Sequence, residues 1–477
     1  ITCLFLILSY VNKKIKKKYR KKNFLKNFFF IGYFFGIGFF LFNTYWISNS
    51  LSFDENLKFL IPFTIVCLPL VLGIFFGISC FLIGPRIENN LASIILFVLI
   101  FSLTDFLRSY IFTGFPWNLW AYSWSWSNES LQSLNFLGLH GFNLLSITLF
   151  CMPAILFKKN FNYKSQFFLT FLTIFLTIYI YGSFKINSYK DINFKNAKLT
   201  NFKIISPGFN LNYDFSDKNL NTLADKLIRY SNPEKEKKTI FIWPEGVFAG
   251  FYFSEIQILK KRIEKNFSKN HLIIFGVNTK SNKKNKTFNS LVVVNNKFEI
   301  IYKYDKIKLV PFGEFIPLKN FLSKFGLKKI TYGYDTFTKG EEKDNFTHEG
   351  INLLPLICYE VIFPNIVQRS SASTNLIVNI SEDAWFGKSI GPAQHFSKAK
   401  FRAIENNNYL LRSANKGYSA IISNTGEVLK SLKPSEIGSI EMKIPLEDRN
   451  NKNKNDLIFF IILITYILAY FMLKRLK

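Results

Sequence analysis

The sequence predicts a polytopic α-helical membrane part joined to a separate α/β domain. The chain of 477 residues is 49% hydrophobic and 18% aromatic, yet it carries 61 Lys and Arg against 32 Asp and Glu, a net charge of +29. Long uncharged apolar stretches occur before residue 184 and after residue 457, whereas short β-rich runs with polar joints fill the part between them. Such an apolar chain is not disordered, and its basic excess points to an anionic membrane surface before nucleic acid.

The predicted spans are uncharged stretches dense in Phe, Leu and Ile, because a spanning helix needs about 20 mostly apolar residues. One of them, at 91–115, contains Asp105 and Arg108. The first twelve residues are also uncharged and precede a basic run, so we expect them to end a truncated first helix; a secretory signal has the opposite order. The expected spans are 27–53, 59–85, 91–115, 130–157, 165–184 and 457–473.

Loop charge predicts the orientation of the chain. Residues 13–26 contain nine Lys or Arg, and short loops rich in these residues stay on the cytoplasmic side. Five crossings from that loop put 185–450 outside, and the last helix returns the chain inside to a basic end. A nucleic-acid-binding tail is the alternative for 13–26, but membrane helices flank that segment. We therefore expect membrane helices at 1–184, an outside domain at 185–450 and a C-terminal helix at 457–473.

The outside domain has the pattern of an α/β fold. Continuous apolar runs bounded by Asn, Gly and Pro are typical of buried strands. Lys-rich joints between them are most simply solvated loops. We expect strands at 203–206, 239–243, 272–277, 291–294, 299–304, 353–357, 376–380 and 419–423, and helices at 218–230, 254–267 and 393–407.

Cys358 is the candidate nucleophile. The other four cysteines fall in predicted spans, so Cys358 has no disulfide partner within its own domain. A lone thiol in an oxidising compartment is either buried or has a task. Cys358 follows an apolar strand and therefore emerges at the rim of a sheet. A buried core cysteine is the alternative interpretation.

Two charged residues share this placement near strand ends. Glu245 ends one apolar run and Lys306 follows another. A carboxylate can accept a thiol proton, and a fixed ammonium can stabilise a thiolate or an oxyanion. Taken singly, each is more simply a surface charge. The four histidines are scattered without metal-ligand spacing, so the sequence predicts neither a metal site nor a Cys-His pair.

These motifs resemble a known superfamily. WPEG with Glu245, YDKIKLVPFGEFIP with Lys306 and Glu314, and CYE with Cys358 resemble the signature segments of the nitrilase, or carbon-nitrogen hydrolase, superfamily, whose catalytic set is Glu-Lys-Cys. NISEDAWFG is also similar. Together with the bracketing spans, FTGFPWNLWAYS at 112–123 resembles the apolipoprotein N-acyltransferase family. The resemblance covers nearly the whole chain.

The resemblance implies a nitrilase-like αββα sandwich outside a bacterial inner membrane, on the periplasmic face. By the family's chemistry, Cys358 takes an acyl chain from a phospholipid as a thioester and passes it to the N-terminal amino group of the diacylglyceryl-cysteine of an apolipoprotein. Glu245 is then the general base and Lys306 stabilises the oxyanion. No cofactor, metal or nucleic acid is implied, and we expect a monomer.

Further residues receive supporting roles from the same resemblance. Glu314 is expected to orient Lys306, with Tyr359 and Glu360 also supporting the site; ordinary loop charges and a packing aromatic are the alternative. Tyr213 and Trp385 are candidate lid or acyl-chain contacts, although Trp385 could equally be a core residue. The family commonly has a Gln-Gly-Asn-Ile-Pro-Gln-like segment followed by Trp, whereas this chain reads SPGFNLNYD with Tyr213.

Two other functions compete with acyl transfer. A membrane-tethered nitrilase-like amidase would use the same Glu-Lys-Cys set with water as the acceptor, but it has no need of so many spans. A transporter or scaffold would only bind through its outside domain. Transporters carry ionisable groups in their spans, and apart from Asp105 and Arg108 the spans here are nearly free of them. The sequence therefore favours acyl transfer.

Overall fold

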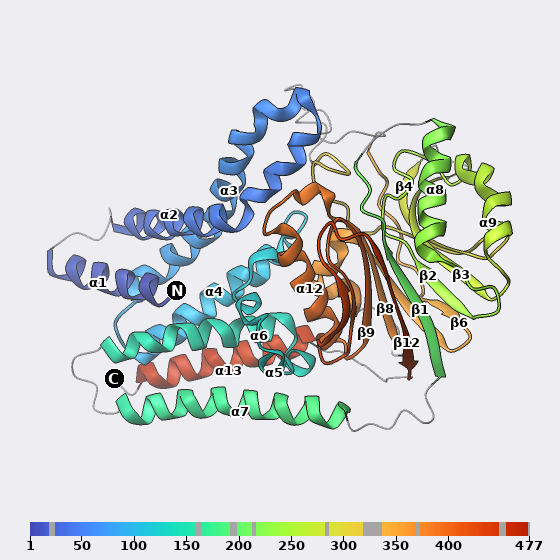
Figure 1. The fold of residues 1–477 in the computed structure, drawn as a ribbon. Helices are drawn as coiled ribbons and strands as arrows, with labels where there is room; N and C mark the ends of the chain where they lie inside the picture. The colour runs from blue at the N-terminus through green and yellow to red at the C-terminus, as the bar shows by residue number, and fades with distance from the viewer. Residues whose placement is uncertain are drawn as a thin grey trace. The chain divides into compact units, whose positions relative to one another are not determined.

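A computed structural model describes residues 1–18, 24–157, 164–190, 198–211, 216–281, 286–317, 336–368, 373–447 and 455–475. Its contacts divide the chain into two compact units (Figure 1). The first contains residues 1–46, 62–191 and 453–477, and the second contains residues 47–61 and 192–452. The first unit is helical, and the second contains all the described strands.

The first unit is built from apolar α-helices joined by short 3₁₀ turns. α2 and α3 approach closely through small residues: a Cβ on Gly36 would lie 3.0 Å from Cα of Gly73, which is the usual way for membrane helices to pack. The helices are α1 (Thr2–Lys18), α2 (Phe24–Thr44), α3 (Ile61–Ile83), α4 (Leu91–Tyr110), α5 (Asn128–Leu131), α6 (Leu134–Cys151), α7 (Lys164–Lys190) and α13 (Asn455–Arg475).

Six helical stretches among the described residues are long and apolar enough to cross a membrane, and they confirm the six predicted helices by length and composition. The third ends at Tyr110 rather than at residue 115. There the chain turns back, because the Phe115 N–H donates to the Arg108 carbonyl (3.0 Å) and the Arg108 side chain donates to the Phe115 carbonyl (2.6 Å). The stretches are Phe24–Phe53, Glu55–Arg86, Leu91–Tyr110, Leu134–Phe157, Phe168–Tyr189 and Asp456–Arg475.

The second unit contains two six-stranded sheets. In the first, the strand order is β12-β1-β2-β3-β4-β5, and β1, β2 and β3 are parallel. In the second, the order is β11-β10-β9-β8-β7-β6, and β7, β8 and β9 are parallel. The strands are β1 (Lys198–Ser206), β2 (Thr239–Ile242), β3 (His271–Lys280), β4 (Thr287–Val294), β5 (Ile300–Asp305), β6 (Phe346–His348), β7 (Ile351–Ile357), β8 (Leu376–Glu382), β9 (Tyr409–Asn415), β10 (Ser419–Ile422), β11 (Val428–Leu432) and β12 (Gly438–Leu446).

The two sheets pack face to face between helices (Figure 1). Along β2, Ile240 and Ile242 join the core between the sheets, whereas Phe241 and Trp243 join a second core beneath α8 (Asp217–Ser231) and α9 (Lys260–Asn266). This alternation is the period of two expected for a strand that is buried on both faces. α12 (Gly391–Glu405) packs against β9 of the other sheet. The layers confirm the predicted αββα sandwich.

All eight predicted strands are present, but four more were missed: β6, β9, β11 and β12. β9 is fully buried although it contains Arg412, Ser413 and Asn415, so it lacks the apolar run used for recognition. β11 and β12 are largely exposed and mix charged with apolar residues. The helix predicted at 254–267 is divided into a 3₁₀ turn (Glu255–Leu259) followed by α9.

Candidate active site

Glu245 lies just beyond the carboxyl end of β2, at the start of a turn that follows Trp243 and Pro244. The Trp243 N–H donates to the Ile274 carbonyl of β3 (2.8 Å), which extends the parallel pairing to the edge of the site. On β3, Gly276 leaves room for this turn, since a Cβ there would lie 2.8 Å from Cα of Glu245. Glu245 itself is 7% exposed. Its carboxylate is therefore held inside the protein.

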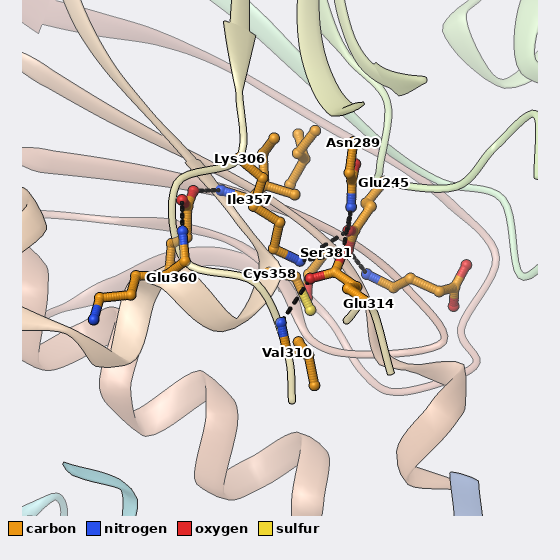
Figure 2. A network of polar contacts seen from close by, with 12 residues as sticks. Glu245, Asn289, Lys306, Val310, Glu314, Ile357, Cys358, Glu360 and Ser381 are labelled. Atoms are coloured by element: carbon orange, nitrogen blue, oxygen red, sulfur yellow. Dashed lines mark hydrogen bonds and ion pairs between the residues drawn. The ribbon is translucent and has the colours of Figure 1, made fainter. Parts of the chain in front are cut away.

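Lys306 follows β5 and is fully buried between two carboxylates. Its Nζ lies 2.9 Å from Glu314 Oε1 and 3.4 Å from Glu245 Oε1. Asn289 on β4 ties the same two groups together, because its Nδ2 donates to Glu245 Oε1 and to Glu314 Oε1, both at 2.8 Å. Figure 2 shows these four side chains converging from separate strands and loops.

Backbone groups complete the fixation of both carboxylates. Glu245 Oε2 accepts a hydrogen bond from the Glu382 N–H at 3.0 Å. Glu314 Oε2 accepts one from the Val310 N–H at 2.8 Å. A carboxylate fixed by both a cation and backbone N–H groups is oriented before any substrate arrives. The Glu314 carboxylate, fixed in this way, is in direct contact with the Lys306 ammonium.

Cys358 is the first residue after β7, and its backbone has φ +49°. This left-handed conformation costs a residue with a Cβ about 1–2 kcal/mol. The thiol is half-buried, and Figure 2 shows its sulfur beside the Lys306 ammonium. A strained backbone at the end of a strand is typical of a nucleophile held in an exposed turn. The structure brings Cys358, Lys306 and Glu245 into one site.

The charges determine the protonation of this site. Burial raises the pKa of the Cys358 thiol and the Glu245 carboxylate raises it further, whereas Lys306 lowers it. Burial alone would lower the pKa of Lys306, but Glu245 and Glu314 outweigh it, so this pKa lies above its ordinary value. At neutral pH the site therefore holds a protonated thiol and an ammonium. The thiol proton would have to be taken up by a base before a thiolate could form.

Glu360 lies apart from the ion pairs and serves as a clamp on the backbone. Its Oε1 accepts hydrogen bonds from Tyr304 Oη (2.9 Å) and from the N–H groups of Ile307 (2.7 Å) and Lys308 (3.0 Å). Its Oε2 accepts one from the Ile357 N–H (2.8 Å). Burial raises the pKa of Glu360 to about 7, against the pull of its backbone donors. This single carboxylate joins the Lys306 loop to the residue before Cys358.

Replacing Glu360 with glutamine is expected to lower the free energy of unfolding by about 1–3 kcal/mol, because the amide has one acceptor oxygen where the carboxylate has two. Either the N–H groups of Ile307 and Lys308 or that of Ile357 then lose their acceptor. Unfolding of the detergent-solubilised full chain measures the change. Glu299→Gln, which alters a carboxylate at a turn with exposed hydrogen bonds, is the control. A loss no larger than that of the control would contradict the clamp.

The remaining predicted residues lie in different surroundings. Tyr359 is buried against Phe363, with ring centroids 5.0 Å apart, and burial raises the pKa of its hydroxyl. Trp385 packs edge-on against Phe53, 5.3 Å away, from the 47–61 segment of the same unit. Asn49 of that segment donates to the Phe386 carbonyl at 2.8 Å. Tyr213 lies outside the described residues.

Several polar residues of this region were missed by sequence reasoning. They are buried side chains on strands or helices that otherwise look like core elements. A signal existed in NISED, where a buried strand ends in consecutive polar residues, and in the single Asn of an apolar stretch on β4. The missed residues are Asn289, Ser381, Asp383, His395 and Arg412. Among the residues that the structure describes, no group of three or more His, Cys, Asp and Glu has the arrangement of a metal site.

The chain is similar to known proteins along most of its length. The family model for carbon-nitrogen hydrolase matches residues 237–452, and that for the apolipoprotein N-acyltransferase N-terminal domain matches residues 3–152. The apolipoprotein N-acyltransferase of Rickettsia prowazekii is 30% identical over 92% of this chain and 89% of the relative. That of Rickettsia bellii is 31% identical over 92% and 88%. An amidase from Nesterenkonia sp. of known structure is 16% identical over 54% of this chain and 94% of the amidase, with a TM-score of 0.38.

The relatives span both units rather than the second unit alone. The apolipoprotein N-acyltransferase of Allorhizobium ampelinum, for example, is 28% identical over 86% of this chain and 78% of the relative. Both family models and relatives over nearly the full length thus agree on one assignment. The chain belongs to the apolipoprotein N-acyltransferase family.

Proposed function

We propose that this chain transfers an acyl chain from a membrane phospholipid, through a thioester on Cys358, to the N-terminal amino group of the diacylglyceryl-cysteine of an apolipoprotein. The observation that carries the proposal is the contact of Lys306 with both Glu245 and Glu314 beside the strained Cys358. The names of the relatives support N-acylation of apolipoproteins. The apolar helices of the first unit fit substrates that are held in a bilayer.

In the first half-reaction, Glu245 removes the proton from the Cys358 thiol and the thiolate attacks an ester carbonyl of the phospholipid. The new C–S bond forms a tetrahedral oxyanion, which the Lys306 ammonium stabilises. Collapse of this intermediate breaks the ester C–O bond. The departing lysophospholipid oxygen takes the proton back from Glu245, and Cys358 is left as the thioester.

In the second half-reaction, the α-amino group of the apolipoprotein attacks the thioester carbonyl. Glu245 accepts a proton from the amine, and Lys306 again stabilises the oxyanion. Breaking the C–S bond returns the thiolate, which recovers its proton from Glu245. The reaction is ping-pong, because the lysophospholipid leaves before the amine reacts. The thioester divides one difficult amide formation into two easier steps.

The direct test uses membranes containing the protein, a phospholipid with a labelled acyl chain, and a diacylated lipopeptide with a free N-terminal cysteine. Amide-linked label on the peptide is the expected result. No label on the peptide, with folded wild-type protein, would refute the transferase. Release of the label as free fatty acid, at the same rate with and without the peptide, would instead indicate an amidase-like hydrolase.

We also propose that the second unit works on the outer, periplasmic face of a bacterial inner membrane. The basic run at 13–26 and the crossings that follow it support this orientation. A reporter inserted near Lys430 is expected to react with a reagent that does not cross the membrane. One placed in the 13–26 segment is expected to react only after the membrane is made permeable. The reverse pattern would overturn the orientation.

A further inference from the structure

A second buried polar cluster lies against Cys358, which also lies beside the Glu245–Lys306–Glu314 ion pairs. It consists of Ser381 on β8, Asp383 just after β8, His395 on α12 and Arg412 on β9, and we call it the Asp383 cluster. Each of the four side chains is at most 1% exposed. Because polar groups are costly to bury, a fully enclosed set of this kind needs an explanation.

The Asp383 cluster reaches Cys358 at two points. The His395 Nε2 lies 3.2 Å from the carbonyl oxygen of Cys358. The Ser381 hydroxyl is a hydrogen-bond partner of the Cys358 thiol. Both residues also contact the Asp383 carboxylate. Ser381 Oγ donates to Asp383 Oδ1 at 2.6 Å, and His395 Nδ1 lies 3.0 Å from that oxygen.

The partners of His395 define its protonation. A carbonyl oxygen only accepts, so Nε2 carries the hydrogen and donates it to Cys358. Burial lowers the pKa of His395 and the Arg412 guanidinium lowers it further, so the ring is neutral at pH 7. Nδ1 then accepts from Arg412 Nη2 at 3.0 Å. In this state the His395 ring is neutral, and its Nε2–H is a fixed hydrogen-bond donor to the Cys358 carbonyl.

The Asp383 carboxylate is fixed by Arg412 and covered by the backbone of Gly417. Arg412 Nη2 donates to both of its oxygens, at 3.0 and 2.8 Å. Burial alone would raise the pKa of Asp383, but Arg412 outweighs it and keeps the carboxylate ionised. The backbone of Gly417 covers the group so closely that a Cβ there would lie 2.1 Å from Oδ2. Asp383 therefore has no room to change position.

We propose that His395, Ser381 and Asp383 are positioning residues for Cys358: His395 holds its carbonyl, Ser381 holds its thiol, and Asp383 fixes Ser381 directly and His395 through Arg412. The reason lies in the backbone of Cys358, which has φ +49° and is strained. Without these two attachments the residue relaxes and its sulfur leaves Lys306. The inference rests on the proposed role of Cys358 as the nucleophile, and it names the residues that keep this nucleophile in position.

The test measures alkylation of Cys358 by iodoacetamide at pH 8 in the detergent-solubilised full chain, with the modified peptide followed by mass spectrometry. His395→Gln keeps an N–H donor where Nε2 stands, whereas His395→Leu has none. The leucine variant is expected to react about 10- to 100-fold more slowly, as for a buried carbonyl that loses its donor, and the glutamine variant within about threefold of wild type. Equal rates in all three proteins, or a faster leucine variant, would overturn the proposal.

A matched control separates positioning from general stability. His271 at the start of β3 is also buried, and its Nε2 lies 3.0 Å from the Glu234 carbonyl and 3.2 Å from the Lys237 carbonyl. It lies at the opposite end of its strand from the site. His271→Leu is expected to lower the unfolding midpoint while alkylation of Cys358 stays within about threefold of wild type. A decrease as large as in His395→Leu would assign the effect to stability and overturn the positioning role.

Ser381→Ala tests the thiol attachment with a minimal change. It removes the hydroxyl partner of the thiol, so the sulfur is less firmly held beside Lys306 and alkylation at pH 8 is expected to slow by about tenfold, the effect of losing one hydrogen bond. An unchanged rate would refute this attachment. Because iodoacetamide replaces the acyl donor, these results do not depend on acyl transfer. Failure of the labelled-phospholipid assay with the expected alkylation pattern would refute the proposed function alone.

Discussion

Replacing Cys358 with serine is expected to abolish the acyl-enzyme and to slow transfer of the labelled acyl chain by at least about 10³-fold. Serine keeps the size of the side chain, but a carboxylate base removes a proton from an alcohol far less readily than from a thiol. The measurement combines hydroxylamine-sensitive label on the protein with amide-linked label on the lipopeptide. Both signals should disappear together, because the thioester precedes the amide in a ping-pong reaction.

Cys67→Ser provides the matched control for this change. Cys67 lies on α3 in the first unit and is exposed, so its replacement removes a thiol without touching the site. It is expected to leave both signals at their wild-type levels. If a hydroxylamine-sensitive acyl-protein persists in Cys358→Ser, the nucleophile lies elsewhere and the proposed mechanism fails.

Replacing Glu245 with glutamine is expected to slow formation of the acyl-enzyme by about 10²- to 10⁴-fold, the range found when a general base is lost. Glutamine occupies the same volume but cannot accept the thiol proton. The thiol whose pKa is raised by burial then stays protonated at neutral pH. Single-turnover acylation of the protein by labelled phospholipid measures this step apart from the later attack by the amine.

Glu441 offers a control with the same kinds of partner. Its Oε1 accepts from Asn201 Nδ2 at 2.8 Å and lies 2.6 Å from Lys237 Nζ, much as Glu245 contacts Asn289 and Lys306. It lies on β12, at the opposite edge of the sheet from β5. Glu441→Gln is expected to leave acylation within about threefold of wild type. Acylation by Glu245→Gln within the same range would show that another group is the base.

The fold was largely predictable where the sequence carries a regular apolar pattern. The six spans and the eight apolar strands were recognised because continuous burial requires continuous apolar residues. β9 was missed for the opposite reason: its buried positions include Arg412, which is stabilised by Asp383 and therefore leaves no apolar run. The end of α4 also depends on a tertiary contact, the return of Phe115 to Arg108.

Local patterns likewise located part of the site. Glu245, Lys306 and Cys358 stood out because each lies at the end of an apolar run, where parallel strands present their carboxyl ends. Glu360 has the same local appearance, yet the structure assigns it to four backbone and hydroxyl donors rather than to the ion pairs. Asn289 had no distinguishing local pattern beyond one amide in an apolar strand.

The sequence by itself determined the membrane helices, the α/β unit between them and the three residue types of the site, since hydrophobic periodicity and strand-end placement are local properties of the chain. Only the tertiary structure decided which carboxylates contact Lys306 and which one binds backbone N–H groups. It also decided that Asp383, His395 and Arg412 meet beside Cys358. Residues of these networks come from strands and helices far apart in sequence. Their meeting depends on sheet order and register, and no local pattern of residues encodes those distances.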